Sequence, residues 1–280
     1  MHREAQRSTE KHILLKIVDF YIFSNIHVAL TASLLVKITL LNIGISENNT
    51  AWFVFFSTLL SYNIIRFLRL NDINNWYNSW LKKHIKHLYI ISILSAIALI
   101  YLTFQLRLKA VVILFPFSLA TFFYVFPLKK YSLRNIAGLK LFLIALSWAG
   151  ITVLFPLIQN YMSIRTIDWV VFIQRFLIII VLTIPFDIRD IDYDISELKT
   201  LPQQLGVLKT KYFGLGLLIA FFTLEVFKTI TEKQLIITLF ITLISALLLW
   251  KSTIKQSKYY SAFIVESIPI VWFLIILILT

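Results

Sequence analysis

The chain has 280 residues, of which 59% are hydrophobic and 15% charged, with a mean hydropathy of +0.83. A soluble domain carries roughly a quarter charged residues, so this composition excludes an ordinary soluble protein. The absence of cysteine excludes disulfides, thiolate nucleophiles and cysteine-based metal sites. The net charge of +13 does not indicate a nucleic-acid partner, because in a membrane protein the positions of the positive charges matter more than their sum.

Long apolar segments follow one another along the whole chain, each about as long as the ~20-residue helix that crosses a bilayer. We expect helices, because backbone groups in lipid must form their hydrogen bonds within the segment. This pattern predicts an all-α polytopic membrane protein, with residues 1–280 in one domain and about nine transmembrane helices. The predicted spans are 13–41, 51–70, 87–106, 109–128, 138–158, 167–188, 212–230, 233–250 and 260–280.

Most of the 27 Lys and Arg residues lie on one side of these spans. That side contains the N-terminal tail and the connections after the second, fourth, sixth and eighth spans. The positive-inside rule therefore predicts a cytoplasmic N-terminus and an external C-terminus. We expect an integral protein of a bacterial inner membrane. Arg175 falls within a span, and two alternatives remain open for its side chain: it pairs with a carboxylate, or it points outward from the bundle.

The chemically most distinctive segment is 184–206, which reads IPFDIRDIDYDISELKTLPQQLG and contains four aspartates within eight residues. If the sixth span continues as a helix, Asp187, Asp190 and Asp194 lie on one face and Asp192 points elsewhere. Carboxylates on one face repel each other unless a cation joins them, and all-oxygen ligation suits Mg²⁺. With lysines following in the same loop, the pattern indicates a metal-bridged diphosphate. The alternative is a solvated acidic loop.

The second Asp-rich motif of the UbiA superfamily of intramembrane prenyltransferases resembles Asp187-Ile-Arg-Asp190-Ile-Asp-Tyr-Asp194, followed by Lys199-Thr200-Leu201-Pro202 and Leu205-Gly206. The match is nearest to the branch that prenylates naphthoquinone precursors. The family's loop after the fourth span is similar to Tyr124-Val-Phe-Pro127-Leu-Lys129-Lys130. Nine helices with a cytoplasmic N-terminus is that family's architecture, so the resemblance covers nearly the whole chain and implies a UbiA-like bundle.

The chain departs from the family at the first Asp-rich motif, N-D-x-x-D-x-x-x-D, at the end of the second span. Asn63 can be matched there, but the aspartate positions are filled by Ile, Arg, Phe or Leu. We therefore expect one of the two metal sites to be lost. In one interpretation Arg66 replaces that metal, because a guanidinium is permanently charged and binds phosphate bidentately. In the others, catalysis has been lost, or Arg66 only anchors the span at the cytoplasmic interface.

The resemblance implies transfer of an isoprenoid from a prenyl diphosphate to a small acceptor, an aromatic compound or quinone precursor. It implies Mg²⁺ on Asp187, Asp190 and Asp194, where the metal would stabilise the leaving diphosphate as a Lewis acid. Asp190, Asp194 and Tyr124 are the expected catalytic residues, the tyrosine ring facing an allylic cation. The expected diphosphate-binding residues are Asn63, Arg66, Lys129, Lys130 and Lys199.

Two functions of other classes compete with this prediction. The first is a non-catalytic UbiA-like membrane protein that binds a lipid or serves as a scaffold. The second is a transporter, which predicts broken helices and internal repeats. For each of these functions we expect the protein to contact the lipid bilayer, and we expect no nucleic-acid partner. The sequence does not set the acceptor, the isoprenoid length or the oligomeric state.

Overall fold

The structure is a computed structural model that describes residues 2–68, 70, 76–125, 139–192, 200–228 and 231–279, with side chains except those of 2–11, 76 and 123–125. Every regular element within these ranges is helical, and η2 and η4 are short π-helical turns. The elements are α1 (His2–Phe23), α2 (Ile26–Asn42), α3 (Asn49–Leu68), α4 (Trp76–Thr103), α5 (Leu108–Val125), α6 (Leu139–Ala149), η2 (Gly150–Leu154), α7 (Phe155–Gln159), α8 (Thr166–Arg189), α9 (Leu201–Leu205), α10 (Val207–Phe227), α11 (Glu232–Lys251), η4 (Tyr260–Val265) and α12 (Ile268–Leu279).

Seven helical segments of the described chain are long and apolar enough to cross a bilayer. An eighth crossing results if His12–Phe23 and Ile26–Asn42 are taken together, and Leu108–Phe122 is a shorter apolar helix. Each of the nine predicted segments therefore coincides with a helix or with a bent helix pair. The polytopic helical fold expected from the sequence is confirmed.

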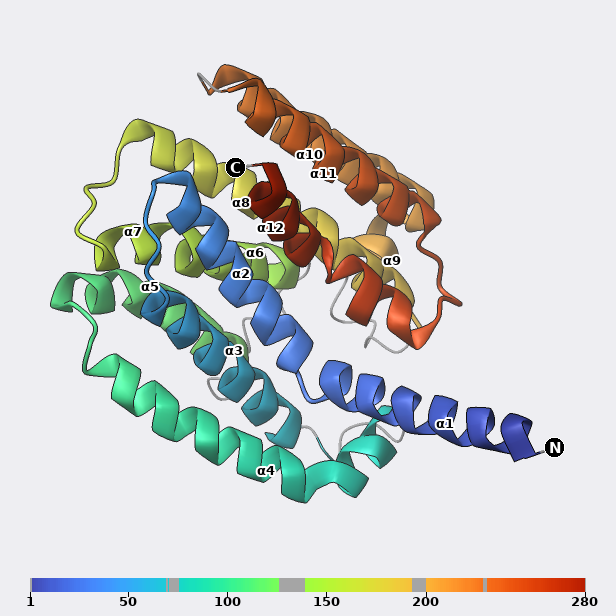
Figure 1. The fold of residues 1–280 in the computed structure, drawn as a ribbon. Helices are drawn as coiled ribbons and strands as arrows, with labels where there is room; N and C mark the ends of the chain where they lie inside the picture. Colours follow the sequence, from blue (N-terminus) through green and yellow to red (C-terminus); the bar gives the residue numbers. More distant parts are fainter. Residues whose placement is uncertain are drawn as a thin grey trace.

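The first predicted span differs from a straight helix, because α1 and α2 meet at an angle of 57°. Asn25 lies at the bend with a φ of 69°, a left-handed conformation that asparagine adopts more readily than most residues. Figure 1 shows α1 in blue leaving the bundle at this point. The break turns the buried Asn25 side chain into the end of the bundle, where it contacts α3.

Helix α8 lies in the main core. Its buried Ile180, Ile184 and Ile188 pack in one cluster with apolar side chains of α6, α10, α11 and α12. A second cluster joins α2, α3, α5 and α7 around Phe155. Because lipid tails are as apolar as leucine, close packing and interhelical hydrogen bonds hold these helices together. Gly150 shows how tight the packing is, since a Cβ there would collide with the Phe117 ring.

Several element ends gather where α1 leaves the bundle (Figure 1). The Tyr77 hydroxyl at the start of α4 donates to the Phe23 carbonyl at 3.2 Å. Lys258, just before η4, binds Asp19 of α1 at 3.0 Å. In the same connection, Gln256 Nε2 donates to the carbonyl of Pro185 in α8 at 2.8 Å. These contacts bring the ends of α1, α4 and α8 and the start of η4 together.

Candidate functional site

A chain of hydrogen bonds positions Arg66 at the end of α3. Its Nε donates to Asn25 Oδ1 at 3.2 Å, and Asn25 Nδ2 donates to Asn63 Oδ1 at 2.7 Å. Asn63 Nδ2 donates to Ser92 Oγ at 3.1 Å, and that hydroxyl donates to the Leu88 carbonyl at 2.8 Å. Both asparagines are buried. Because buried polar groups are costly unless they are hydrogen-bonded, this chain fixes each amide in one orientation.

The Arg66 guanidinium also stacks on an aromatic ring. Its Cζ lies 4.3 Å from the centroid of the Tyr77 ring, within the range of a cation–π contact. The Tyr77 hydroxyl is held in turn by the Phe23 carbonyl. Arg66 is therefore fixed from two sides by groups of the bundle. A snorkelling arginine that only reaches the interface does not need such partners.

Helix α8 ends at Arg189, which changes the predicted arrangement of the aspartates. Asp190 is the C-cap, with its N–H bonded to the Phe186 carbonyl at 2.9 Å, and the chain turns after it. The continuous helix considered for the sequence up to Asp194 therefore stops at Arg189, and Asp194 lies outside the described residues. Asp187, only 3% exposed, accepts a hydrogen bond from Lys140 Nζ of α6 at 2.9 Å.

Asp190 is paired with a different cation. Arg189 binds it bidentately, with Nε at 2.7 Å and Nη2 at 2.9 Å from the two carboxylate oxygens. Both side chains are partly exposed. The repulsion expected between neighbouring carboxylates is thus offset by Lys140 at Asp187 and by Arg189 at Asp190. The two carboxylates lie one helical turn apart and each is held in a defined position.

The arginines of the two sequence blocks lie within electrostatic reach of the same two groups. Arg66 of α3 and Arg189 of α8 both act electrostatically on the Tyr77 hydroxyl and on the Glu266 carboxylate. Arg189 in turn holds Asp190. The position matched to the first Asp-rich motif and the position matched to the second therefore lie at the same end of the bundle, around shared groups.

The other predicted residues are less fully described. Tyr124 lies in α5, but its side chain is outside the described part of the structure. Asp194, Lys129, Lys130 and Lys199 lie outside the described residues altogether. Sequence reasoning did not assign Asn25, Tyr77, Lys140, Arg189 or Glu266 to the site. For Asn25 and Glu266, a polar residue inside an apolar span was the available signal.

The donor set at Asp187 and Asp190 fits Mg²⁺. Among the residues that the structure describes, no group of three or more His, Asp and Glu gathers around one point. Mg²⁺ does not need such a cage, since it binds through one or two carboxylates and completes its shell with water and substrate phosphate. Asp187 and Asp190, each paired with a cation in this structure, are the described carboxylates that could hold such a metal.

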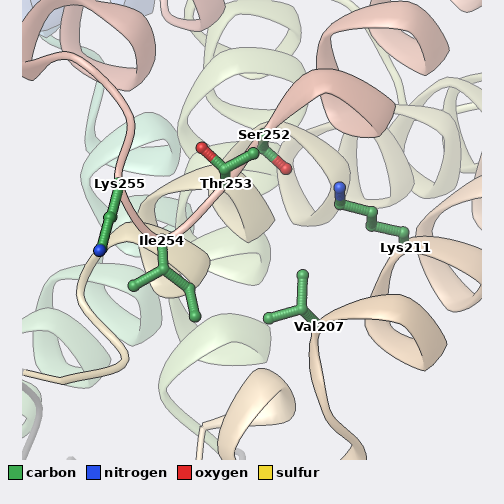
Figure 2. Close-up of a pocket in the computed structure, with 6 residues that line it drawn as sticks. All are labelled: Val207, Lys211, Ser252, Thr253, Ile254 and Lys255. Atoms are coloured by element: carbon green, nitrogen blue, oxygen red, sulfur yellow. The ribbon is translucent and has the colours of Figure 1, made fainter.

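A separate pocket of about 460 Å³ lies between the start of α10 and the connection from α11 to η4. Figure 2 shows Lys211 and Lys255 on opposite sides of its labelled residues. The lining residues are Val207, Lys211, Ser252, Thr253, Ile254 and Lys255. Lys211 Nζ is occupied by the Trp250 carbonyl at 2.7 Å. None of the predicted site residues that the structure describes lines this pocket, so it is separate from the described arginines and aspartates of the site.

No protein-family model and no curated protein sequence matches the chain. A solved structure of a digeranylgeranylglyceryl phosphate synthase is similar to it, with a TM-score of 0.56 and 17% sequence identity. The likeness covers 94% of this chain and 96% of that chain. The chain has the UbiA-type fold. In this fold, one sequence block lies on α3 and the other on α8. Arg66 of the first block and Arg189 of the second both act electrostatically on Tyr77 and Glu266.

Proposed function

We propose that the chain is a membrane prenyltransferase that moves an isoprenoid from a prenyl diphosphate to a small acceptor, an aromatic compound or quinone precursor. The observation that carries this proposal is that Arg66, held by Asn25 and Tyr77, and Arg189, bound to Asp190, both act electrostatically on the Tyr77 hydroxyl. Permanently charged guanidiniums bind phosphate oxygens in pairs, which a diphosphate requires. The likeness to a solved synthase of the same fold supports the proposal.

Arg66 takes the role that a metal-binding aspartate motif would have on α3. Its guanidinium is held by Asn25 and Tyr77 before any substrate arrives, so little rearrangement is needed to receive an anion. Such preorganised charge is most effective in a site of low dielectric constant. Ile64 beside it cannot bind a metal, which agrees with the use of arginine here.

Lys140 and Arg189 neutralise Asp187 and Asp190 in this structure. Asp190 and Asp194, with Asp187 assisting, would hold Mg²⁺, which would supply Lewis-acid stabilisation of the leaving diphosphate. Arg189, which is bound to Asp190 in this structure, would then offer its guanidinium to the diphosphate. Asn63 orients Asn25 and thereby Arg66, while Lys129, Lys130 and Lys199 add positive charge at the cytoplasmic mouth.

The isoprenoid lies between helices, and the Tyr124 ring stabilises the allylic cation that forms as the diphosphate leaves. The N-terminus and this end of the bundle are cytoplasmic by the distribution of Lys and Arg. The diphosphate group can then bind from the aqueous cytoplasmic side, while the apolar isoprenoid tail lies between the helices in the membrane.

The direct test uses the purified protein with Mg²⁺, farnesyl or geranylgeranyl diphosphate, and a hydroxybenzoate or dihydroxynaphthoate as acceptor, followed by mass analysis. We expect a prenylated product from the wild type and a loss of at least about a hundredfold in rate for Asp190→Ala or Asp194→Ala. Asp168→Asn is the matched control, because Asp168 caps the other end of α8 with Arg165. Equal turnover by wild type and both site variants would refute the metal assignment.

A non-catalytic lipid-binding or scaffold protein is the second candidate, and the replacement of the first aspartate motif by Ile64 and Arg66 favours it. Binding of Mg²⁺ with the inert geranylgeranyl thiolodiphosphate should raise thermal stability in either a catalyst or a diphosphate binder. A ligand at a hundred times its Kd contributes about 2.7 kcal/mol. Stabilisation without any turnover identifies a binder, and absence of both identifies a scaffold.

A further inference from the structure

The pocket of about 460 Å³ drawn in Figure 2 lies at the ends of two candidate membrane spans. The span Val207–Phe227 begins at this pocket, and the span Glu232–Lys251 ends beside it. Its lining residues come from the start of α10 and from the connection between α11 and η4. Because spans of about twenty residues match the hydrocarbon thickness of a bilayer, their ends lie at the depth of the lipid headgroups. The pocket therefore lies at headgroup depth.

Two lysines give this pocket a positive charge. Lys211 of α10 and Lys255 of the connection lie on opposite sides of the labelled residues in Figure 2. No acidic side chain is among the described residues that line it. A lysine ammonium has three N–H donors, and Lys211 directs one of them to the Trp250 carbonyl at 2.7 Å. Lys255 is exposed. Both ammonium groups therefore have donors for an anion.

Hydrogen bonds fix the wall of the pocket that faces α10. The buried Ser252 hydroxyl donates to the Leu249 carbonyl at 2.7 Å, which ties the connection to the end of α11. The Thr253 N–H donates to Gln256 Oε1 at 3.3 Å. Gln256 Nε2 donates in turn to the Pro185 carbonyl of α8 at 2.8 Å. The pocket is thus shaped before a ligand arrives, which lowers the ordering cost of binding.

Exposed apolar and aromatic side chains surround the two lysines. Ile254 lies in the pocket itself and is exposed, as are Leu208 and Tyr212 on α10 and Trp250 at the end of α11. The Tyr212 and Trp250 rings are in edge-on contact, with 5.9 Å between their centroids. Tyr and Trp are typical of the membrane interface, where one end of the side chain is apolar and the other is wet. The surface therefore combines positive charge with a platform for hydrocarbon.

We propose that this pocket binds one anionic phospholipid. The lipid phosphate lies between the ammonium groups of Lys211 and Lys255, and the acyl chains run along the exposed faces of α10 and α11. Basic pockets at the ends of membrane helices attract anionic headgroups in this way. A zwitterionic lipid carries a cation that both lysines repel, so the site prefers a headgroup with net negative charge. Free phosphate has the charge but lacks the chains that the apolar platform holds.

The test measures binding to the full chain in detergent by native mass spectrometry. The probes are palmitoyl-oleoyl phosphatidylglycerol, phosphatidylcholine with the same acyl chains, and inorganic phosphate. We expect one phosphatidylglycerol to bind at least about tenfold more tightly than either other probe, and Lys211→Met/Lys255→Met to lose at least about tenfold of that affinity. Lys82→Met/Lys83→Met is the matched control, because it removes two exposed lysines from α4, which lies across the bundle from α10 and α11 in Figure 1.

A second variant, Ile254→Glu, keeps both lysines and places a negative charge at an exposed position of the pocket. It should also weaken phosphatidylglycerol binding at least about tenfold, with thermal unfolding in detergent unchanged. Wild-type affinity in both pocket variants overturns the proposal, and so does an equal loss in the α4 control. Phosphatidylcholine or free phosphate bound as tightly as phosphatidylglycerol overturns it as well. Because no prenyl transfer is measured, this outcome is independent of the proposed function.

Discussion

Arg66 Nε donates a hydrogen bond to Asn25 Oδ1 at 3.2 Å, joining side chains 41 positions apart. Asn25 occupies the bend between α1 and α2, so the break in the first span and the position of the arginine are one structural feature. Asn63 completes the link by accepting from the same asparagine at 2.7 Å. The three side chains form a rigid support at the position where the family motif would place aspartates.

Removing the Asn25 amide should loosen Arg66. Asn25→Gly keeps the left-handed backbone but leaves Asn63 Oδ1 and Arg66 Nε without their partner. Each buried group left unpaired costs about 1–3 kcal/mol, so we expect a lower free energy of unfolding in detergent and a weaker Kd for geranylgeranyl thiolodiphosphate. Asn160→Gly, at the other end of the bundle, should leave the Kd unchanged. Unchanged affinity in Asn25→Gly would argue against the support role.

Lysine should not replace Arg66. Arg66→Lys keeps the positive charge but loses the planar fork and the stacking on Tyr77, which lies 4.3 Å away. We expect the Kd for the thiolodiphosphate, measured by titration calorimetry, to weaken about tenfold, which is 1.4 kcal/mol. Arg165→Lys is the control, since Arg165 pairs with Asp168 at the opposite end of α8. Full affinity in Arg66→Lys would mean that a point charge is sufficient.

The pair of Lys140 and Asp187 allows stability and activity to be separated. Asp187→Asn leaves the largely buried Lys140 ammonium without the carboxylate 2.9 Å away. Breaking a buried ion pair on one side costs about 3–5 kcal/mol, so this variant should be clearly destabilised. The double variant Lys140→Met/Asp187→Asn should recover part of that stability in a denaturant titration without recovering turnover. Recovery of turnover by the double variant would show that Asp187 has only a structural role.

High pH should weaken the contact between η4 and α1. Burial lowers the pKa of Lys258, but its hydrogen bonds to Asp19 and Tyr259 outweigh this and raise the pKa above its ordinary value of 10.5. Burial and the hydrogen bond to Asp19 raise the pKa of Tyr259 above 10.0. Both groups hold their protons more tightly in the folded state, so this stability is complete below the ordinary values and is lost as pH rises through the raised ones.

The measurement for this contact is thermal unfolding in detergent below pH 10.0 and above pH 10.5. Because both side chains are partly exposed and screened, the effect should be less than about 1 kcal/mol. Lys258→Met should be less stable than wild type at the lower pH and should show a smaller further loss at the higher pH. Lys255→Met, an exposed lysine of the same connection, should keep the wild-type pH profile.

The sequence by itself determined the fold class. The apolar segments are long enough that backbone hydrogen bonding in lipid leaves only helices, and every segment coincides with a helix or a bent pair. Asp187 and Asp190 could also be singled out, because closely spaced carboxylates at the end of an apolar span are conspicuous. The predicted span 167–188 placed Asp187 correctly on α8 and ended one residue before the helix does, but local periodicity left open whether the helix continued to Asp194.

The tertiary structure decided which of the polar residues meet. Arg175 was left open by its sequence and proves to be buried, donating to the Leu35 carbonyl at 3.2 Å and lying 5.2 Å from the Trp272 ring. The hydrogen bonds of Asn25 to Asn63 and Arg66 depend on contacts between residues far apart in the chain. Hydrophobic periodicity contains no information on such pairs, because interhelical contacts arise only when the helices pack.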